Sequence, residues 1–196
     1  MTDTTVIRRS RLSAEREHEV FDAVLELLRE NGYESLTMDA IAARTHASKA
    51  TLYRQWKGKP ELVATALRHA KSGALPDPDT GSLRGDLRLL ASYGLKDADS
   101  DHALMRGLAQ AAHAYPELHE AMRELLILPE LEKIQSLLRR AVDRGEVPAD
   151  SPALEFVPHM LCGAFVTREW VEDQRVDLDY LTRYLDAVVF PALGVE

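Results

Sequence analysis

The segment from Thr37 to Leu62 constrains the fold of this chain more than any other stretch. Two short helical patterns stand on either side of residues 45–47, which read Thr-His-Ala. Thr37 can cap the first helix, because its hydroxyl can accept a hydrogen bond from a free backbone N–H of the first turn. Ser48 can cap the second helix in the same way. Two short helices joined by so tight a turn are typical of a helix-turn-helix.

Each of these two helices has a predicted inner face. Ile41 and the small Ala42 are expected to face inward from the first helix. Leu52 and Trp56 stand four positions apart on the second helix and therefore share one face, which we expect to be buried. The side chains left on the outer faces of the second helix are Lys49, Ala50, Thr51 and Tyr53.

Charge is distributed unevenly around this segment. No acidic residue stands between Asp39 and Glu61, and such a block suits a surface that meets phosphate. The basic residues within it are Arg44, Lys49, Arg54, Lys57 and Lys59. The whole chain carries a net charge of −8, so we expect contact with nucleic acid to be confined to this basic block.

From Ser48 to Leu62 the chain reads SKATLYRQWKGKPEL. Together with the preceding helix and the Gly32-Tyr33 break, this run resembles the DNA-binding domain of the TetR family of one-component transcription regulators. The matching segment extends roughly from Arg16 to Val63. One departure is His46, which stands where the family usually has glycine. Histidine tolerates a left-handed conformation better than a branched residue would, at some energetic cost.

The resemblance implies roles for particular side chains. Lys49 and Thr51 would point toward base edges, and Tyr53 toward a backbone phosphate. Thr37 and Lys59 would hold phosphates. The full set of expected DNA-binding residues is Thr37, Arg44, Ser48, Lys49, Ala50, Thr51, Tyr53, Lys57 and Lys59. The alternative for these residues is an ordinary exposed helix face without a ligand.

The rest of the chain shows only helical periodicity. A first helix can be capped by Ser13 and end at Asn31-Gly32, and Pro60 suits the first position of a helix that runs to about Lys71. Later helices are expected over about Ser82–Lys96, Asp101–Ala114, Pro116–Arg144, Ser151–Val171 and Asp177–Leu193. Pro129 should kink the third of these, Gly145 should end it, and Ser151 should cap the fourth, which Pro158 could bend.

With the resemblance, this pattern predicts an all-α fold with two parts. The first is an N-terminal three-helix helix-turn-helix DNA-binding domain, and the second is a C-terminal helical ligand-binding and dimerisation domain. We expect a flexible basic tail over residues 1–12, the DNA-binding domain over 13–59 and the effector-binding and dimerisation domain over 60–196. Arg8, Arg9 and Arg11 in the tail could reach DNA as an arm or have no role.

The last two helices are expected to pair with those of a second copy. In the family that the chain resembles, they form a four-helix bundle at a two-fold axis. The expected interface residues are Leu154, Val157, Leu161, Leu181, Leu185 and Val188. The alternative is that these apolar residues are the core of a single chain.

The resemblance also implies a pocket for a small-molecule effector among the middle helices. The candidates that combine suitable bulk and polarity are Tyr93, Met105, Leu108, His113, Met122, Leu126, Met160 and Phe165. Plain core packing is the alternative at each position, because methionine is a common gap-filler in cores as well as a lining of adaptable sites.

The sequence predicts neither a cofactor nor a catalytic site. Pro116 interrupts the set His113, Glu117 and His119, and no His-Glu-x-x-His pairing occurs, so we expect no metal site. The single cysteine, Cys162, excludes an intrachain disulfide and fits a reducing cytoplasm. No apolar run approaches the ~18 residues that span a bilayer, so we expect a soluble cytoplasmic protein and no membrane partner.

These observations predict a homodimeric, ligand-responsive transcription regulator, a repressor that a small-molecule effector releases from double-stranded operator DNA. One alternative is an all-α small-molecule-binding protein or enzyme with an incidental helix-turn-helix. Another is a DNA-binding architectural or activator protein without a ligand. The operator sequence, the effector and the regulated genes are not encoded in any pattern that the chain shows.

Overall fold

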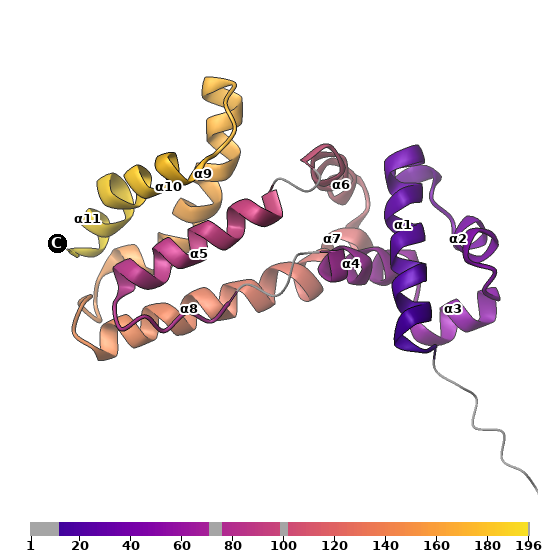
Figure 1. The fold of residues 1–196 in the computed structure, drawn as a ribbon, viewed down its shortest axis with the longest axis horizontal. Coiled ribbons are helices and arrows are strands. Elements are labelled where there is room, and N and C mark those ends of the chain that lie inside the picture. The colour runs from indigo at the N-terminus through magenta and orange to yellow at the C-terminus, as the bar shows by residue number, and fades with distance from the viewer. Residues whose placement is uncertain (1–11, 71–75, 99–101, 196) are drawn as a thin grey trace, which may run out of the picture. The chain divides into compact units, whose positions relative to one another are not determined.

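The computed structural model describes residues 12–70, 76–98 and 102–195 of the 196-residue chain. The predicted arm residues Arg8, Arg9 and Arg11 lie outside the described residues. In the described part every regular element is a helix, which confirms the predicted all-α class (Figure 1).

The chain divides into two compact units. The first comprises Met1–Ala70 and Ala103–Leu125, and the second comprises Lys71–His102 and Leu126–Glu196. The helices of the first unit are α1 (Ala14–Ser35), α2 (Met38–Thr45), α3 (Lys49–Gln55), α4 (Lys59–Ala70), α6 (His102–Ala114) and α7 (Pro116–Met122). The second unit contains α5 (Leu83–Ala98), α8 (Leu128–Asp143), the 3₁₀ helix η2 (Pro152–Phe156), α9 (Val157–Glu172), α10 (Leu178–Tyr184), the π-helix η3 (Leu185–Val189) and α11 (Phe190–Leu193). The π-helix η1 (Arg123–Ile127) spans the boundary between the units.

Helix α1 begins where the sequence predicts. The Ser13 hydroxyl accepts a hydrogen bond from the backbone N–H of Arg16, as an N-cap should. Gly32 breaks the helical path with φ 73° and ψ 174°, and the chain then makes one more turn to Ser35. The predicted break is thus confirmed, although the helical turn beyond it was not expected.

The turn between α2 and α3 also follows the prediction. Oγ1 of Thr37 accepts from the N–H of Ala40 over 3.1 Å, and Oγ of Ser48 accepts from the N–H of Thr51 over 3.1 Å. His46 ends α2 in the left-handed conformation with φ 53° and ψ 28°. Its own N–H reaches the carbonyl of Ala43. Histidine therefore takes the place that glycine fills more easily.

The core of the first unit lies where α1 meets α2 and α4. Val20 and Val24 of α1 are fully buried, and so are Ile41 of α2 and Leu52 of α3. Figure 1 shows α1 between the α2–α3 pair and α4. The long helix is therefore the support on which the two short helices rest.

Two π-helices in the structure each precede a proline. Pro129 stands just after η1, and Pro191 stands just after η3. Proline lacks an N–H and its ring clashes with the carbonyl four residues earlier, so the wider π-turn accommodates it. The structure marks Pro129 by this change of helix type, and the bend expected there stays a prediction. The sequence predicted one continuous helix over Asp177–Leu193, but the structure changes to a π-helix over Leu185–Val189. The prediction did not take the effect of Pro191 into account.

The second unit has its core between α5, α8 and the C-terminal helices. Leu87, Leu137, Leu185 and Phe190 are among its most buried side chains. Gly145 follows α8 with φ 73°, and so the predicted stop is confirmed. The predicted cap at Ser151 is wrong in part: its side chain makes no capping hydrogen bond, and the turn after it is a 3₁₀ helix.

Two of the positive-φ positions, His46 and Gly32, predict opposite changes in stability. His46→Gly should raise the free energy of unfolding by about 1 kcal/mol, because glycine adopts the left-handed conformation without a steric penalty. Gly32→Ala should lower the free energy of unfolding by about 1 to 3 kcal/mol through backbone strain alone, since a Cβ there would meet open space. Urea unfolding measures both changes. If both variants have the same free energy of unfolding as the unmodified protein, neither backbone conformation is strained.

Candidate nucleic-acid interface

Helix α3 is buried on one face and exposed on the other. Leu52 is fully buried and Trp56 is 4% exposed, whereas Tyr53 is 53% exposed. Lys49 and Ala50 are also exposed. The predicted inner face is confirmed, and Lys49, Ala50 and Tyr53 are exposed as predicted, whereas Thr51, which was also expected on the outer faces, is only partly exposed.

Contacts from α1 hold the two ends of the α2–α3 pair. Nη2 of Arg16 donates to the backbone oxygen of Thr45 over 2.7 Å, at the end of α2. Nε2 of Gln55 donates to the Glu17 carboxylate, at the end of α3. The sequence analysis missed these anchors, because nothing local in the sequence links positions about thirty to forty residues apart.

Two hydroxyl groups of the predicted DNA-binding set, those of Thr37 and Ser48, serve as helix caps. Oγ of Ser48 lies 2.8 Å from Oγ1 of Thr51, in addition to accepting from the N–H of Thr51. Thr37 caps α2. Each hydroxyl can both donate and accept, so a cap bond leaves capacity for one further partner.

Two of the predicted basic residues pair with carboxylates. Lys49 on α3 forms an ion pair with Asp39 on α2. Nη1 of Arg44 lies 3.1 Å from a Glu26 oxygen, and its Nη2 lies 2.8 Å from a Glu30 oxygen. Hydrogen bonding to Glu30 is the main cause of the raised pKa of Arg44. Exposed pairs of this kind are worth at most about 1 kcal/mol, so a phosphate can displace the carboxylates.

The two remaining lysines are placed differently from each other. Lys57 is exposed, and its backbone N–H donates to the Glu61 carboxylate over 2.8 Å. Lys59 is half-buried, and its ammonium donates to the backbone oxygen of Tyr33 over 3.0 Å. Burial is the main cause of the lowered pKa of Lys59.

The predicted effector-pocket residues are divided between the two units. Met105, Leu108, His113 and Met122 belong to the first unit, and Tyr93, Leu126, Met160 and Phe165 to the second. Leu108 and Leu126 are buried, whereas Tyr93 and Met105 are about two-fifths exposed, at 38% and 43%. Within the second unit, the Phe165 ring approaches Gly94 so closely that an added Cβ would lie 3.4 Å from it.

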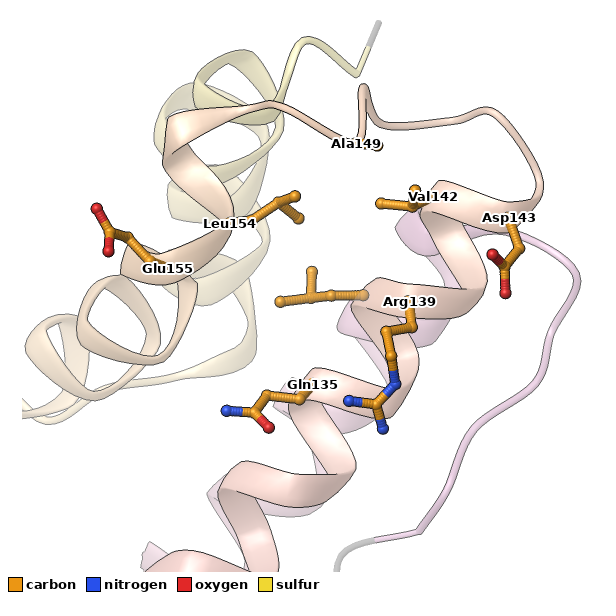
Figure 2. A pocket seen from close by; sticks show the side chains of 8 residues that line it. Gln135, Arg139, Val142, Asp143, Ala149, Leu154 and Glu155 are labelled. Carbon is orange, nitrogen blue, oxygen red and sulfur yellow. The ribbon is translucent and has the colours of Figure 1, made fainter.

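The second unit also contains an open groove of about 460 Å³ between α8 on one side and Ala149 and η2 on the other (Figure 2). Leu154 and Val142 face each other across it. Its full lining is Gln135, Leu138, Arg139, Val142, Asp143, Ala149, Leu154 and Glu155. None of the predicted pocket residues lines this groove.

The residues expected at a dimer interface differ in exposure. Val157, Leu181 and Leu185 are at most 3% exposed within one chain. Leu154 and Leu161 pack against the core of the second unit, and Val188 is 40% exposed. Large apolar side chains that the sequence analysis did not single out are more exposed, namely Phe156, Val166, Trp170 and Val171.

Comparison with known proteins agrees with this geometry. Residues 20–66 match the family model of bacterial regulatory proteins of the tetR family, and residues 77–188 match the tetracyclin repressor-like C-terminal domain. The chain belongs to the TetR family. It is a transcriptional regulator of that family, in which DNA binding by the helix-turn-helix and ligand-responsive repression are typical.

Relatives of the TetR family cover most of the chain. An HTH-type transcriptional regulator of Mycobacterium tuberculosis is 32% identical over 91% of this chain and 88% of that protein. A DNA-binding transcriptional repressor TetR of Mycobacteroides abscessus is 34% identical over 84% of this chain and 87% of that protein. The crystal structure of the TetR family regulator SCO0332 superimposes with a TM-score of 0.67 and 30% identity, covering 93% of this chain and 99% of that one.

Among the described residues, no helix is both long and apolar enough to cross a lipid bilayer.

The Lys49–Asp39 pair predicts that a single neutralising substitution strengthens DNA binding. Asp39→Asn removes the carboxylate that competes with phosphate for Lys49, so affinity for a selected duplex should rise by up to about fivefold. Asp22→Asn, at an exposed position on α1, removes the same charge and is the matched control. Fluorescence anisotropy with labelled duplex measures both, and an equal gain in the two variants would show that only net charge matters.

Proposed function

We propose that this chain is a homodimeric repressor whose α3 enters the major groove of an operator and which a small molecule releases. The observation that supports this most is the division of α3 between a buried face and an exposed face. Leu52 and Trp56 fix the helix on the unit, and Lys49 and Tyr53 extend from it. A helix held on one side and open on the other has the form that groove recognition requires.

The exposed face supports a specific set of roles. Lys49 and Thr51 read base edges, and Tyr53 donates its hydroxyl to a backbone phosphate. Ala50 allows the helix backbone to approach the DNA closely. The exposed cations Lys57 and Arg44 add phosphate contacts, Arg44 after it leaves its two glutamates. We also propose that residues 13–59 form the DNA-binding domain and that the protein acts on DNA in the cytoplasm.

A second copy completes the DNA-binding form, because two recognition helices read two half-sites about 34 to 36 Å apart. The exposed apolar side chains of α9 and η3 are suited to this contact: Trp170 is 81% exposed, Val166 61% and Val188 40%. Val166 and Trp170 stand four positions apart on α9 and therefore share one face, and a contiguous exposed apolar patch marks an interaction site. The buried side chains of Val157, Leu181 and Leu185 then pack beneath this interface within each chain.

The effector acts through residues 60–196 in this proposal. It binds one arrangement of the dimer more tightly than the other, and only that difference in affinity can move the two α3 helices away from successive major-groove faces. By linkage, operator DNA must weaken effector binding by the same factor. Met105 and Met122, both in the first unit, remain the proposed adaptable lining, because methionine side chains adjust to ligands of different shape.

The proposed roles of Lys49 and Tyr53 predict different effects on specificity. Lys49→Ala should relax the preference at one base position by about 1 to 3 kcal/mol, because the lysine contacts a base edge. Tyr53→Phe should weaken binding evenly across all sequences, because it removes a hydroxyl that meets a phosphate. Fragments selected from a random duplex library supply the operator, and competition among its single-base variants measures both effects.

If both substitutions leave binding unchanged, α3 does not read DNA, and this would contradict the proposed function. Gln110→Glu, on the exposed surface of α6, controls for a general effect of surface substitution.

The proposed dimer interface predicts that a single substitution at an exposed apolar position separates the dimer into monomers. Val188→Glu or Trp170→Glu would bury an unpaired carboxylate between two chains, while each side chain is exposed in a single chain. We therefore expect a monomeric mass by light scattering with the helical circular dichroism retained, whereas Gln110→Glu should remain dimeric. A monomeric mass for the unmodified protein at micromolar concentration would refute the homodimer.

A further inference from the structure

Helix α9 has an inner face and an outer face of different character. The inner face carries Val157, Ala164 and Arg168, which are at most 7% exposed. On the outer side, residues spaced alternately three and four positions apart lie along one line, as such spacing requires in a helix. These residues are Phe156 at the end of η2 and His159, Gly163, Val166 and Trp170 on α9, and we call them the outer stripe.

The outer stripe is apolar and aromatic at the surface of a single chain. Trp170 is 81% exposed, Val166 61% and Phe156 52%, and His159 is exposed as well. The rings of Phe156 and His159 are in contact, with centroids 6.2 Å apart, so the stripe continues without a break from η2 into α9. No residue of the stripe is a carboxylate, a lysine or an arginine. Interface cores share these properties, because they are rich in aromatic residues and poor in charge.

The stripe is symmetric in size about Gly163. Phe156 stands seven positions before this glycine and Trp170 seven positions after it, while His159 and Val166 stand four before and three after. The two largest groups are therefore at the ends, and the smallest residue is at the centre. A second copy turned end for end presents the same sequence of sizes, so the stripe is complementary to itself.

Gly163 has no explanation within one chain. Glycine disfavours the interior of a helix, and Gly163 lies near the middle of α9. An added Cβ there would meet no atom of the described chain within 4 Å, so no packing inside one copy requires the missing side chain. The absence of a side chain is useful where another backbone approaches closely.

A two-fold axis that crosses two antiparallel helices brings residue i of one copy to residue j of the other, and j to i. With this axis at Gly163, Trp170 of each copy lies opposite Phe156 of the partner subunit. Val166 then lies opposite His159 of the partner subunit. The two glycines face each other at the crossing, where the backbones come closest.

The area of the stripe agrees with such an interface. A large aromatic side chain buries about 150–250 Å², so at their exposed fractions the two aromatic residues and Val166 remove on the order of 400 Å² per chain from water. A standard interface buries about 800 Å² per partner. The stripe therefore supplies about half of a stable dimer interface, and Leu178 and Val188 on the following helices are also exposed and apolar.

We propose that the α9 helices of two copies pack antiparallel through their outer stripes and cross at Gly163, so that Trp170 of each copy packs on Phe156 of the partner subunit. The inference rests on the proposed homodimer. It adds the direction of the two helices, the point where they cross and the residues that meet.

Substitution of the glycine tests the crossing point. Gly163→Leu should raise the dimer dissociation constant at least about tenfold, because its side chain stands where the two backbones meet. Gly107→Leu on α6 is the matched control, since a Cβ there also meets open space, and it should leave the dissociation constant unchanged. Analytical ultracentrifugation measures the constant, and circular dichroism establishes that both variants are folded.

Two exposed neighbours on α9 test which residues belong to the stripe. Trp170→Ala should raise the dissociation constant at least about tenfold, as expected for an aromatic anchor of an interface. Val171→Ala, at the next position, changes a side chain that is 80% exposed but lies off the stripe, and it should have no effect. In the double variant Phe156→Ala/Trp170→Ala the losses should be smaller than the product of the single losses, because both substitutions break one contact.

Cross-linking through cysteine tests the direction of the helices. Cys162, the only cysteine of the chain, is exposed next to the crossing, so a short bismaleimide should link two unmodified copies. In the variant Cys162→Ser/Val171→Cys the new thiols stand about 24 Å apart along an antiparallel pair, at 1.5 Å per residue, and should not be linked.

Any of three results would overturn the inference: a dimer as tight in Gly163→Leu as in the unmodified protein, an equal loss in Val171→Ala and Trp170→Ala, or linkage at position 171 as efficient as at Cys162. A monomeric mass for the unmodified protein would instead refute the proposed homodimer, so the two failures are distinguishable. If Gly163→Leu does not fold, the alanine variants and the cross-linking decide.

Discussion

The packing of α3 on α1 is the interaction on which the proposed DNA-reading surface depends. A helix of seven residues is too short to be stable by itself, so its position must come from tertiary contacts. Leu52 is fully buried, and the Trp56 indole meets the Phe21 ring edge-on with centroids 5.7 Å apart. Arg16 and Glu17 then fix the ends of the α2–α3 pair. Because the inner face is held in this way, the outer face can present Lys49 and Tyr53 in one orientation.

Two cations of the proposed reading surface already pair with carboxylates in the protein without DNA. Asp39 holds Lys49, and Glu26 and Glu30 hold Arg44, so DNA must compete with carboxylates of the same chain. The competition is modest at exposed positions. This competition nevertheless reduces the attraction of the surface to arbitrary polyanions, and the net charge of −8 of the chain has the same effect. The operator with complementary contacts is therefore the preferred partner. Lys59 differs from these residues because its partners are a carbonyl and aromatic rings.

Much of the fold could be predicted because its signals are local. Caps at Ser13, Thr37 and Ser48 are each a hydroxyl placed three residues before the N–H that it accepts from. The left-handed conformation of His46 could be anticipated because the resembled family usually has glycine at this position. The π-helix before Pro191 was missed because no helical periodicity reveals it, and the setting of Lys59 was missed because Tyr33 and Tyr115 are distant in sequence. The apolar spacing of the C-terminal helices could not separate residues that fill one chain, such as Leu185, from those left exposed, such as Trp170.

Hydroxyl-radical footprinting of the protein on its selected operator tests the central claim most directly, because it reports how many recognition helices contact the duplex and how far apart they are. Two α3 helices related by a two-fold axis should protect two tracts whose centres are about 34 to 36 Å apart, on one face of the duplex. The tracts should carry sequences related by that symmetry. A single protected tract, or protection without any such spacing, would contradict a dimeric regulator that reads DNA through α3.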